Sequence, residues 1–222
     1  MSKAIAMIPT RMGSQRLKKK NLRELNGVPL ITHAIRKCQE AAVFDEIWVN
    51  SESIEFASIA ETEGIQFHQR PEALGNHQAT SEQFVAEFLN EHKCDIIFQV
   101  HSIAPLLSVS DIRGFVNTMN SGHYDCLLGA EEIQIECAMN DTPINFTFNA
   151  KTNSQELVPV QRVSWSITAW RRDIFLQAVK HGHCATYFGK IGFFPVSQMA
   201  SHVIKTESDL QIAEALLPLI QS

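Results

Sequence analysis

Residues 4–21 read AIAMIPTRMGSQRLKKKN, a short apolar run that passes directly into a basic loop. The run at 4–8 is typical of a buried strand, and Pro9 would end it. Five cations then fall within residues 11–20, at the place where an open α/β sheet has its ligand crevice. This junction therefore predicts an α/β fold with an anion site directly after its first strand.

The side chains of the basic loop suit a phosphate ligand. Gly13 lets the backbone approach a phosphate closely, and Ser14 and the neighbouring amides can donate to its oxygens. Arg11 and Lys20 can neutralise a triphosphate and the additional charge of its transition state. The loop has neither the Gly-Lys-Ser/Thr of a Walker A motif nor a Gly-x-Gly-x-x-Gly pattern, so a solvated cationic loop is the alternative.

Strand and helix patterns alternate along most of the chain. Strand patterns recur at 46–50, 65–68, 95–100, 124–130, 163–170 and 191–196, with helical spacing between most of them. Thr80 and Gln83 have the spacing of a capping box, Ser110 is placed to cap another helix, and Thr206 begins the last one. This rhythm predicts a mostly parallel sheet with helices on both faces. We expect one domain over 1–222, with an irregular arm at about 132–162 that includes an exposed β ribbon at 145–148.

Composition limits the class of protein and its partners. The chain has 222 residues, 45% of them hydrophobic and 19% charged, as in folded globular proteins. A net charge of −5 gives no general attraction to nucleic acid or membranes, so we expect neither as a partner. The amino-terminal apolar run is too short for a secretion signal or a membrane span. The five dispersed cysteines suggest reduced, mostly buried thiols, so we expect a cytoplasmic protein.

Several motifs together resemble those of the acylneuraminate cytidylyltransferases. The opening Ile-Pro-x-Arg-x-Gly-Ser at 8–14 is followed by Lys-Asn at 20–21 and by Leu-x-Gly-x-Pro-Leu-Ile at 25–31. Arg-Pro-Glu-x-Leu at 70–74, Thr-Ser at 80–81 and Pro-Leu at 105–106 continue the resemblance. It ends with Phe-Gly-Lys-x-Gly-Phe-Phe-Pro at 188–195 and Thr-Glu-x-Asp-Leu at 206–210. The resemblance thus extends over nearly the whole chain.

The resemblance implies a fold, a reaction and a set of binding residues. The implied fold is a three-layer α/β/α nucleotidyltransferase sandwich, and the arm would join two copies in a homodimer. The implied reaction transfers CMP from CTP to a keto-sugar acid of the sialic, legionaminic, pseudaminic or octulosonic type and releases pyrophosphate. The residues implied to bind the nucleotide are Arg11, Gly13, Ser14, Lys20, Asn21, Arg70 and Ser81, with Arg11 and Lys20 also catalytic and with Arg70 and Ser81 at the base. Gln99 is implied to face the sugar acid.

Each of the residues outside the basic loop has a simpler interpretation. Arg70 could be a loop cation paired with Glu72, and Ser81 could serve only the start of a helix. Gln99 ends a central strand, a position where polar side chains tend to face a ligand crevice. His101 departs from the family's shorter Gln-Pro-Thr-Ser-Pro turn. It could bind the acceptor or act as a base, or it could be a buried histidine bonded to the backbone. His77 leaves the same two readings open.

The segment 203–205 lacks the metal-binding carboxylates that the resembling family has at these positions. The family has Asp-Ile-Asp before the Thr-Glu pair, and these carboxylates hold Mg²⁺, which prefers hard oxygen ligands. Here the positions carry Val203 and Lys205, which cannot ligate the cation, so we predict no protein ligands for a metal. Asp209 lies near but in a first helical turn, where acids commonly serve the helix dipole. Either Lys205 replaces part of the metal's charge, or the chain has lost catalysis and keeps a binding role.

Overall fold

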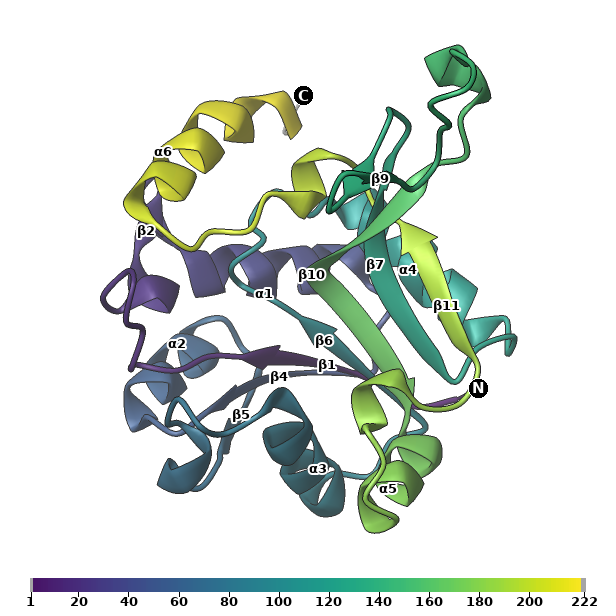
Figure 1. The fold of residues 1–222 in the computed structure, drawn as a ribbon. Helices are drawn as coiled ribbons and strands as arrows, with labels where there is room; N and C mark the ends of the chain where they lie inside the picture. Colours follow the sequence, from purple (N-terminus) through teal and green to yellow (C-terminus); the bar gives the residue numbers. More distant parts are fainter. Residues whose placement is uncertain (1, 221–222) are drawn as a thin grey trace.

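The apolar run at the amino end forms β1, near the middle of a seven-stranded sheet. In this computed structural model, which describes residues 2–220, the strand order is β11-β7-β10-β6-β1-β4-β5 (Figure 1). Strand β10 runs antiparallel to both of its neighbours, and the other pairs are parallel. The strands are β1 (Ala4–Pro9), β4 (Glu46–Ser51), β5 (Gln66–Gln69), β6 (Ile96–Val100), β7 (Cys126–Ile133), β10 (Val160–Arg171) and β11 (Ile191–Pro195).

Helices cover both faces of the sheet, so the predicted three-layer sandwich is confirmed. Alternate residues of β1 divide between two cores, with Ala4, Ala6 and Ile8 on one side and Ile5 and Met7 on the other, as the two-residue period of a strand requires. The first core is closed by α1 (Leu30–Ala41), α2 (Ala57–Thr62) and α4 (Val109–Asn120), and the second by α3 (Ser81–Glu91) and α5 (Arg172–Lys180).

A third apolar cluster attaches the carboxyl-terminal helix to the basic loop. Helix α6 (Glu207–Leu216) contributes Leu210 and Ala213, and the loop contributes Leu17. Ile204, directly before the helix, and Leu106, in the turn after β6, are buried in the same cluster. The cluster therefore holds three segments that are distant in sequence against one another at one end of the sheet.

The capping residues were predicted with mixed success. Thr80 and Gln83 form the expected capping box at α3, and Thr206 forms another with Asp209 at α6. The assignment of Ser110 as a cap is wrong, because Ser108 caps α4 and pairs with Asp111. Helix α5 had no sequence prediction. It begins directly after β10, without a side-chain cap.

The arm projects from the sheet as expected (Figure 1), but its ribbon lies elsewhere than predicted. The paired strands are β8 (Ala138–Met139) and β9 (Thr142–Pro143), joined by Asn140 and Asp141, both with positive φ, as two-residue hairpin turns favour. The ribbon predicted at 145–148 is wrong. There the Asn145 side chain, rather than a strand ladder, makes the links, bonding Cys137 N at 2.8 Å, Ile135 O at 2.9 Å and Val158 O at 3.0 Å.

Two further sequence expectations concern the cysteines and the membrane. All five cysteines are free; two are buried and two half-buried, whereas Cys184 is exposed. Among residues 2–220 no helix has both the length and the apolar character needed to cross a membrane.

Candidate functional site

The chain order of the strands creates a crevice at the carboxyl end of β1. From β1 the chain adds β4 and then β5 on one side, and it returns to add β6 on the other side. Loops that leave β1 and β6 therefore separate at this point, which is where open α/β sheets bind ligands. A cavity of about 300 Å³, the basic cavity, opens here. Its lining residues are Pro9, Thr10, Arg11, Ser14, Lys20, Asn21, Arg70, Leu74, Asn76, Ala79, Phe84, His101 and Ile103.

Six of the residues proposed from the sequence meet in this cavity: Arg11, Ser14, Lys20, Asn21, Arg70 and His101. Sequence reasoning missed two others that complete its wall, Asn76 and Phe84. Phe84 directly follows the capping box of α3, and no sequence signal distinguishes it from the other apolar residues of that helix. His77 is exposed and does not line the cavity.

Hydrogen bonds hold the basic loop in its conformation. The Asn21 amide donates to Arg11 O at 3.1 Å, and the buried Ser102 hydroxyl donates to Asn21 Oδ1 at 2.9 Å. Arg11 Nη1 reaches across to Asn76 O at 3.2 Å. The loop after β1 is thus fixed both to the turn after β6 and to the segment before α3, so the cavity is largely pre-formed.

Lys20, at the end of the basic loop, is half-buried against the segment before α6. Its Nζ donates to Ile204 O at 3.1 Å. Burial lowers the pKa of Lys20, as do the nearby charges of Arg16, Arg11 and Lys205, against a smaller opposing effect of Asp209. Because a bound anion would relieve this repulsion, the clustered cations favour a negatively charged ligand.

Arg70 is buried, with 3% of its surface exposed, and the proposed pairing with Glu72 is wrong. Its guanidinium donates to Asn50 Oδ1 at 2.8 Å, to Thr10 O at 2.7 Å and to Glu52 Oε2 at 3.1 Å. The Arg70 Cζ also lies 4.7 Å from the centre of the Phe84 ring. Its hydrogen bonds are therefore made to other protein groups. The planar guanidinium, held by these bonds, forms part of the cavity wall.

His101 is enclosed beside Lys20. Its Nε2 is buried and has no hydrogen-bond partner, so the ring is not bonded to the backbone through this atom. Burial, reinforced by Lys20, lowers the pKa of His101 to about 4. The imidazole is consequently neutral near pH 7 and weakly basic, which disfavours its proposed role as a general base and favours hydrogen bonding to a ligand.

Three predicted site residues do not line the cavity. Ser81 is the first residue of α3 and does not line the cavity, whereas Phe84 of the same helix does. Gln99 is fully buried between β1 and β10, where its Oε1 accepts from Thr168 Oγ1 at 3.4 Å. Gly13 does not line the cavity either. A Cβ added to it would meet no atom within 4 Å, so internal packing does not require glycine there.

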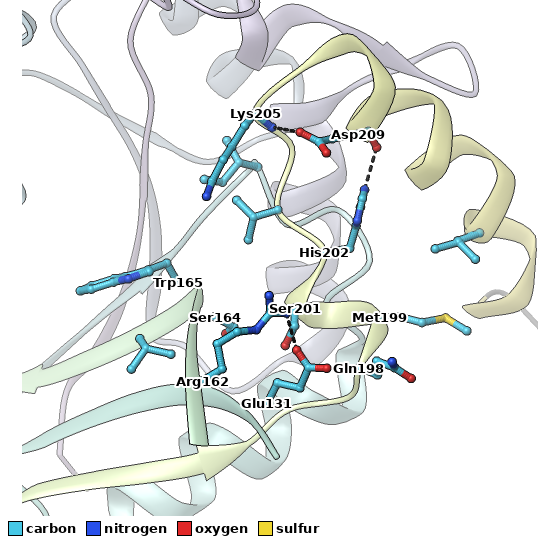
Figure 2. A pocket seen from close by; sticks show the side chains of 14 residues that line it. Glu131, Arg162, Ser164, Trp165, Gln198, Met199, Ser201, His202, Lys205 and Asp209 are labelled. Atoms are coloured by element: carbon cyan, nitrogen blue, oxygen red, sulfur yellow. Dashed lines mark hydrogen bonds and ion pairs between the residues drawn. The ribbon is translucent and has the colours of Figure 1, made fainter. Parts of the chain in front are cut away.

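Figure 2 shows a second cavity, which has a volume of about 840 Å³ and shares a lining residue with the first. We call it the mixed cavity because apolar and charged side chains share its wall. Ile103 lines both cavities. The other lining residues are Glu131, Arg162, Val163, Ser164, Trp165, Gln198, Met199, Ser201, His202, Val203, Lys205, Asp209 and Leu216. The sequence had singled out only Val203, Lys205 and Asp209 among them.

Some polar groups of the mixed cavity have hydrogen-bond or ion-pair partners within the protein, and others do not. Arg162 forms an ion pair with Glu131, and His202 Nε2 lies 2.7 Å from Asp209 O. The buried hydroxyl of Ser201 has no partner. Within residues 2–220 no ion pair joins the Lys205 ammonium to a carboxylate, and Figure 2 shows its side chain directed into the cavity. A polar, acidic ligand would meet these groups.

The donor set of the basic cavity does not fit a Mg²⁺ ion held by protein carboxylates. No carboxylate is among its lining residues. Asp209 Oδ2 accepts from Lys205 N at 2.9 Å and from Thr206 N at 2.8 Å as part of the helix cap, and Glu52 is bonded to Arg70 and to Met12 N. Within residues 2–220 no three His, Cys, Asp or Glu side chains are grouped to hold a metal.

A mostly parallel sheet between two layers of helices is the nucleotidyltransferase fold. A family model described as Cytidylyltransferase matches residues 5–219. The chain therefore belongs to the cytidylyltransferase family.

Curated relatives and a solved structure agree with this membership. N-acylneuraminate cytidylyltransferase A of Danio rerio is 30% identical over 121 residues, which are 54% of this chain and only 28% of the relative. Post-translational flagellin modification protein B of Campylobacter coli is 26% identical over 98% of this chain and 96% of its own. A CMP:2-keto-3-deoxy-manno-octonic acid synthetase complexed with CTP shares the fold, with a TM-score of 0.74 at 18% identity over 98% of this chain and 99% of its own.

Proposed function

We propose that this protein transfers CMP from CTP to a keto-sugar acid and releases pyrophosphate. The observation that carries the proposal is the pair of adjoining cavities, one lined by Arg11 and Lys20 and the other of mixed polarity, which share Ile103. Two substrates that must react with each other need two sites that meet. The names of the relatives, which include N-acylneuraminate and pseudaminic acid cytidylyltransferases, support a sugar acid as the acceptor.

In this proposal the basic cavity takes CTP and the mixed cavity takes the acid. Arg11, Ser14 and Lys20 would bind the triphosphate, Asn21 would hold the loop and approach the ribose, and Phe84 with Arg70 would form the wall beside the base. Lys205 would attract the acceptor carboxylate. The two ligands would meet near Ile103, beside His101.

The chemistry assigned to the residues is charge stabilisation rather than proton transfer. A hydroxyl oxygen of the acceptor attacks the α-phosphorus of CTP, the bond from that phosphorus to the bridging oxygen breaks, and pyrophosphate leaves while the hydroxyl proton passes to solvent. Arg11 and Lys20 would stabilise the charge that develops on the leaving pyrophosphate. His101, being neutral, would donate a hydrogen bond from Nε2. No step is assigned to a metal, because the cavity offers no carboxylate for one.

A coupled assay tests this function. The purified protein is incubated with CTP and, in turn, sialic, legionaminic, pseudaminic and octulosonic acids, and pyrophosphate is measured. Calorimetry with CTP, UTP, ATP and GTP runs beside it, and we expect CTP to bind most tightly. CTP binding without pyrophosphate for any acid would favour a catalytically impaired nucleotide-binding protein. Equal or absent heats for all four nucleotides would remove the cytidylyl assignment.

A further inference from the structure

Strand β10 contains an irregularity that the proposed function leaves unexplained. Its pairing with β7 passes from Val163 opposite Ala130 to Thr168 opposite Leu128. The four residues 164–167 therefore lie opposite one residue, Gly129. Such bulges bend a strand and redirect its side chains, and they occur often beside active sites.

The backbone within this bulge is strained at its largest residue. Trp165 has φ +55°, a left-handed conformation that is a genuine outlier for a bulky side chain. Strain of this kind persists only where the surroundings impose it, and it gathers at ligand sites. The position of Trp165 is therefore better explained by where the indole must go than by the stability of the strand.

The surroundings of the bulge hold Trp165 in this conformation. The Ser164 hydroxyl donates to Gly129 O at 3.1 Å and lies 2.7 Å from the Ser166 hydroxyl. A Cβ on Gly129 would lie 3.0 Å from Ile167 O and 3.3 Å from Ser164 Oγ, so any larger residue at 129 would crowd the bulge. Ser164, Ser166 and Gly129 thus hold the backbone of Trp165 in its left-handed conformation.

The indole belongs to the mixed cavity, and the residue that follows it contacts a residue of the basic cavity. Trp165 lines the mixed cavity, and the next residue, Ser166, accepts from His101 N at 3.0 Å. His101 in turn lines the basic cavity. Figure 2 shows the indole on the side of the mixed cavity opposite Gln198 and Met199, with the Lys205 side chain directed toward the same end.

We propose that Trp165 is a specificity-determining residue whose indole face packs against the apolar face of the sugar ring of the acceptor. The inference rests on the proposed function, since it assigns the mixed cavity to a sugar acid. An aromatic face matches the C–H groups on one face of a sugar ring, and the indole combines large contact area with few rotatable bonds. The stack orients the ring, while Lys205 attracts the carboxylate at the same end of the cavity.

The test uses Trp165→Gly and Trp165→Phe in the full chain. Glycine adopts positive φ without strain, so Trp165→Gly removes the indole and leaves the bulge intact. We expect its KM for the acid that the wild type uses to rise about tenfold, with CTP affinity within about twofold of wild type and an unchanged or higher melting temperature. Trp165→Phe should retain part of the affinity for the acid.

Tryptophan fluorescence gives a readout that does not depend on turnover. The acid alone should change the emission of the wild type and not that of Trp165→Phe. Trp48, whose ring centre lies 4.1 Å from that of His92 in a tilted arrangement, lines neither cavity. It supplies the matched control, because Trp48→Phe should keep the acid-dependent change. Emission spectra of the wild type, Trp165→Phe and Trp48→Phe together distinguish a contact between Trp165 and the acid from a general effect on folding.

The other possible outcomes show whether the role of Trp165 fails alone or whether the proposed function fails as well. A normal KM for the acid in Trp165→Gly would overturn the inference and leave the proposed function standing. Loss of CTP binding or of stability in Trp165→Gly would assign Trp165 a structural role and overturn the inference as well. A wild type that binds CTP but neither binds nor uses any acid would contradict the proposed function, and the inference would fail with it.

Discussion

Arg11 and Arg70 carry the same guanidinium group, yet their surroundings give them different tasks. Arg70 is enclosed and bonded to Asn50, Thr10 and Glu52, so its charge is already compensated. Arg11 is half-buried and has one weak contact, to Asn76 O at 3.2 Å. Burial and pairing, rather than residue type, therefore decide which cation is available to a ligand.

This contrast predicts different effects of alanine substitution at the cavity cations and at Arg70. Arg11→Ala and Lys20→Ala should each weaken CTP binding by about tenfold or more, because each removes a charged hydrogen bond worth about 1.5–3 kcal/mol, while the domain remains folded. Arg70→Ala should instead destabilise the fold by about 3–5 kcal/mol, because it leaves Glu52 without its buried partner. Calorimetry and urea unfolding measure the two effects. A stable Arg70→Ala protein, or an unfolded Arg11→Ala protein, would contradict this division.

His101 should make stability depend on pH in a defined window. Its pKa is about 4 in the folded protein against 6.5 ordinarily, so between these values the unfolded chain binds a proton that the folded protein does not. Stability from this group is therefore complete above pH 6.5 and falls as the pH drops toward 4. At pH 5 the loss is about 2 kcal/mol.

Urea unfolding at pH 7.5 and pH 5 in wild type and His101→Gln isolates this contribution. The other histidines titrate in both proteins, so the difference between the two pH dependences belongs to His101. We expect the substituted protein to lose less stability on acidification. The same loss in both proteins would show that His101 is not enclosed as the structure has it.

At the scale of elements, the segment 203–205 before α6 connects the basic loop with the mixed cavity. Ile204 is buried in the third apolar cluster, and its carbonyl oxygen accepts a hydrogen bond from Lys20 Nζ. Val203 and Lys205 on either side line the mixed cavity. The segment thus touches the basic loop through its backbone and the acceptor cavity through its side chains.

This placement predicts that carboxylates introduced here would create a metal dependence. Wild-type CTP binding should change little with Mg²⁺. The double change Val203→Asp with Lys205→Asp should make it strongly Mg²⁺-dependent, because it replaces one positive charge by two negative ones near Lys20. Without metal the double variant should bind CTP more weakly, since unit charges at about 4 Å interact by roughly 4 kcal/mol at an effective dielectric of about 20.

Titrations of CTP into both proteins, with Mg²⁺ and with a chelator, measure these effects. Strong Mg²⁺ dependence in the wild type would mean that the metal ligands lie elsewhere, with Asp209 the first candidate. A double variant that behaves like the wild type would show that segment 203–205 does not influence the bound nucleotide.

On the scale of the whole molecule, the arm exposes an unusual amount of apolar surface. Met139, Phe148 and Val158 are 66%, 75% and 74% exposed, and Ile135 and Ile144 are more than half exposed. Exposed apolar patches of this kind mark interaction sites. We propose that a second copy of this chain covers the arm, in line with the homodimer that the family resemblance implies.

Sedimentation analysis of Phe148→Asp tests the dimer. We expect the wild type to sediment as a dimer and Phe148→Asp to shift toward the monomer, because burying a charge in an apolar interface is unfavourable. Ile54→Asp is the matched control, since Ile54 is 61% exposed outside the arm, and it should remain dimeric. A monomeric wild type, or an unaffected Phe148→Asp, would exclude the arm as the contact.

The sequence by itself determined the layered fold and the basic loop. Both depend on local order along the chain: apolar runs of strand length separated by helical spacing, and cations placed directly after β1. Arg11, Ser14 and Lys20 could be named for this reason, because the loop that carries them is short and follows a strand whose end defines the crevice. Asn21 was named from the family resemblance.

Tertiary structure alone decided which of the remaining residues reach the cavities. Gln99 and Ser81 were named from the family resemblance, and Gln99 also from its place at the end of a central strand. The pairing of β6 with β10 buries Gln99, and in α3 Phe84 rather than Ser81 lines the basic cavity. Trp165 has no local signal at all, since its bulge exists only because β10 pairs with β7 around Gly129. Contacts between distant segments set burial and direction, and a linear pattern does not contain them.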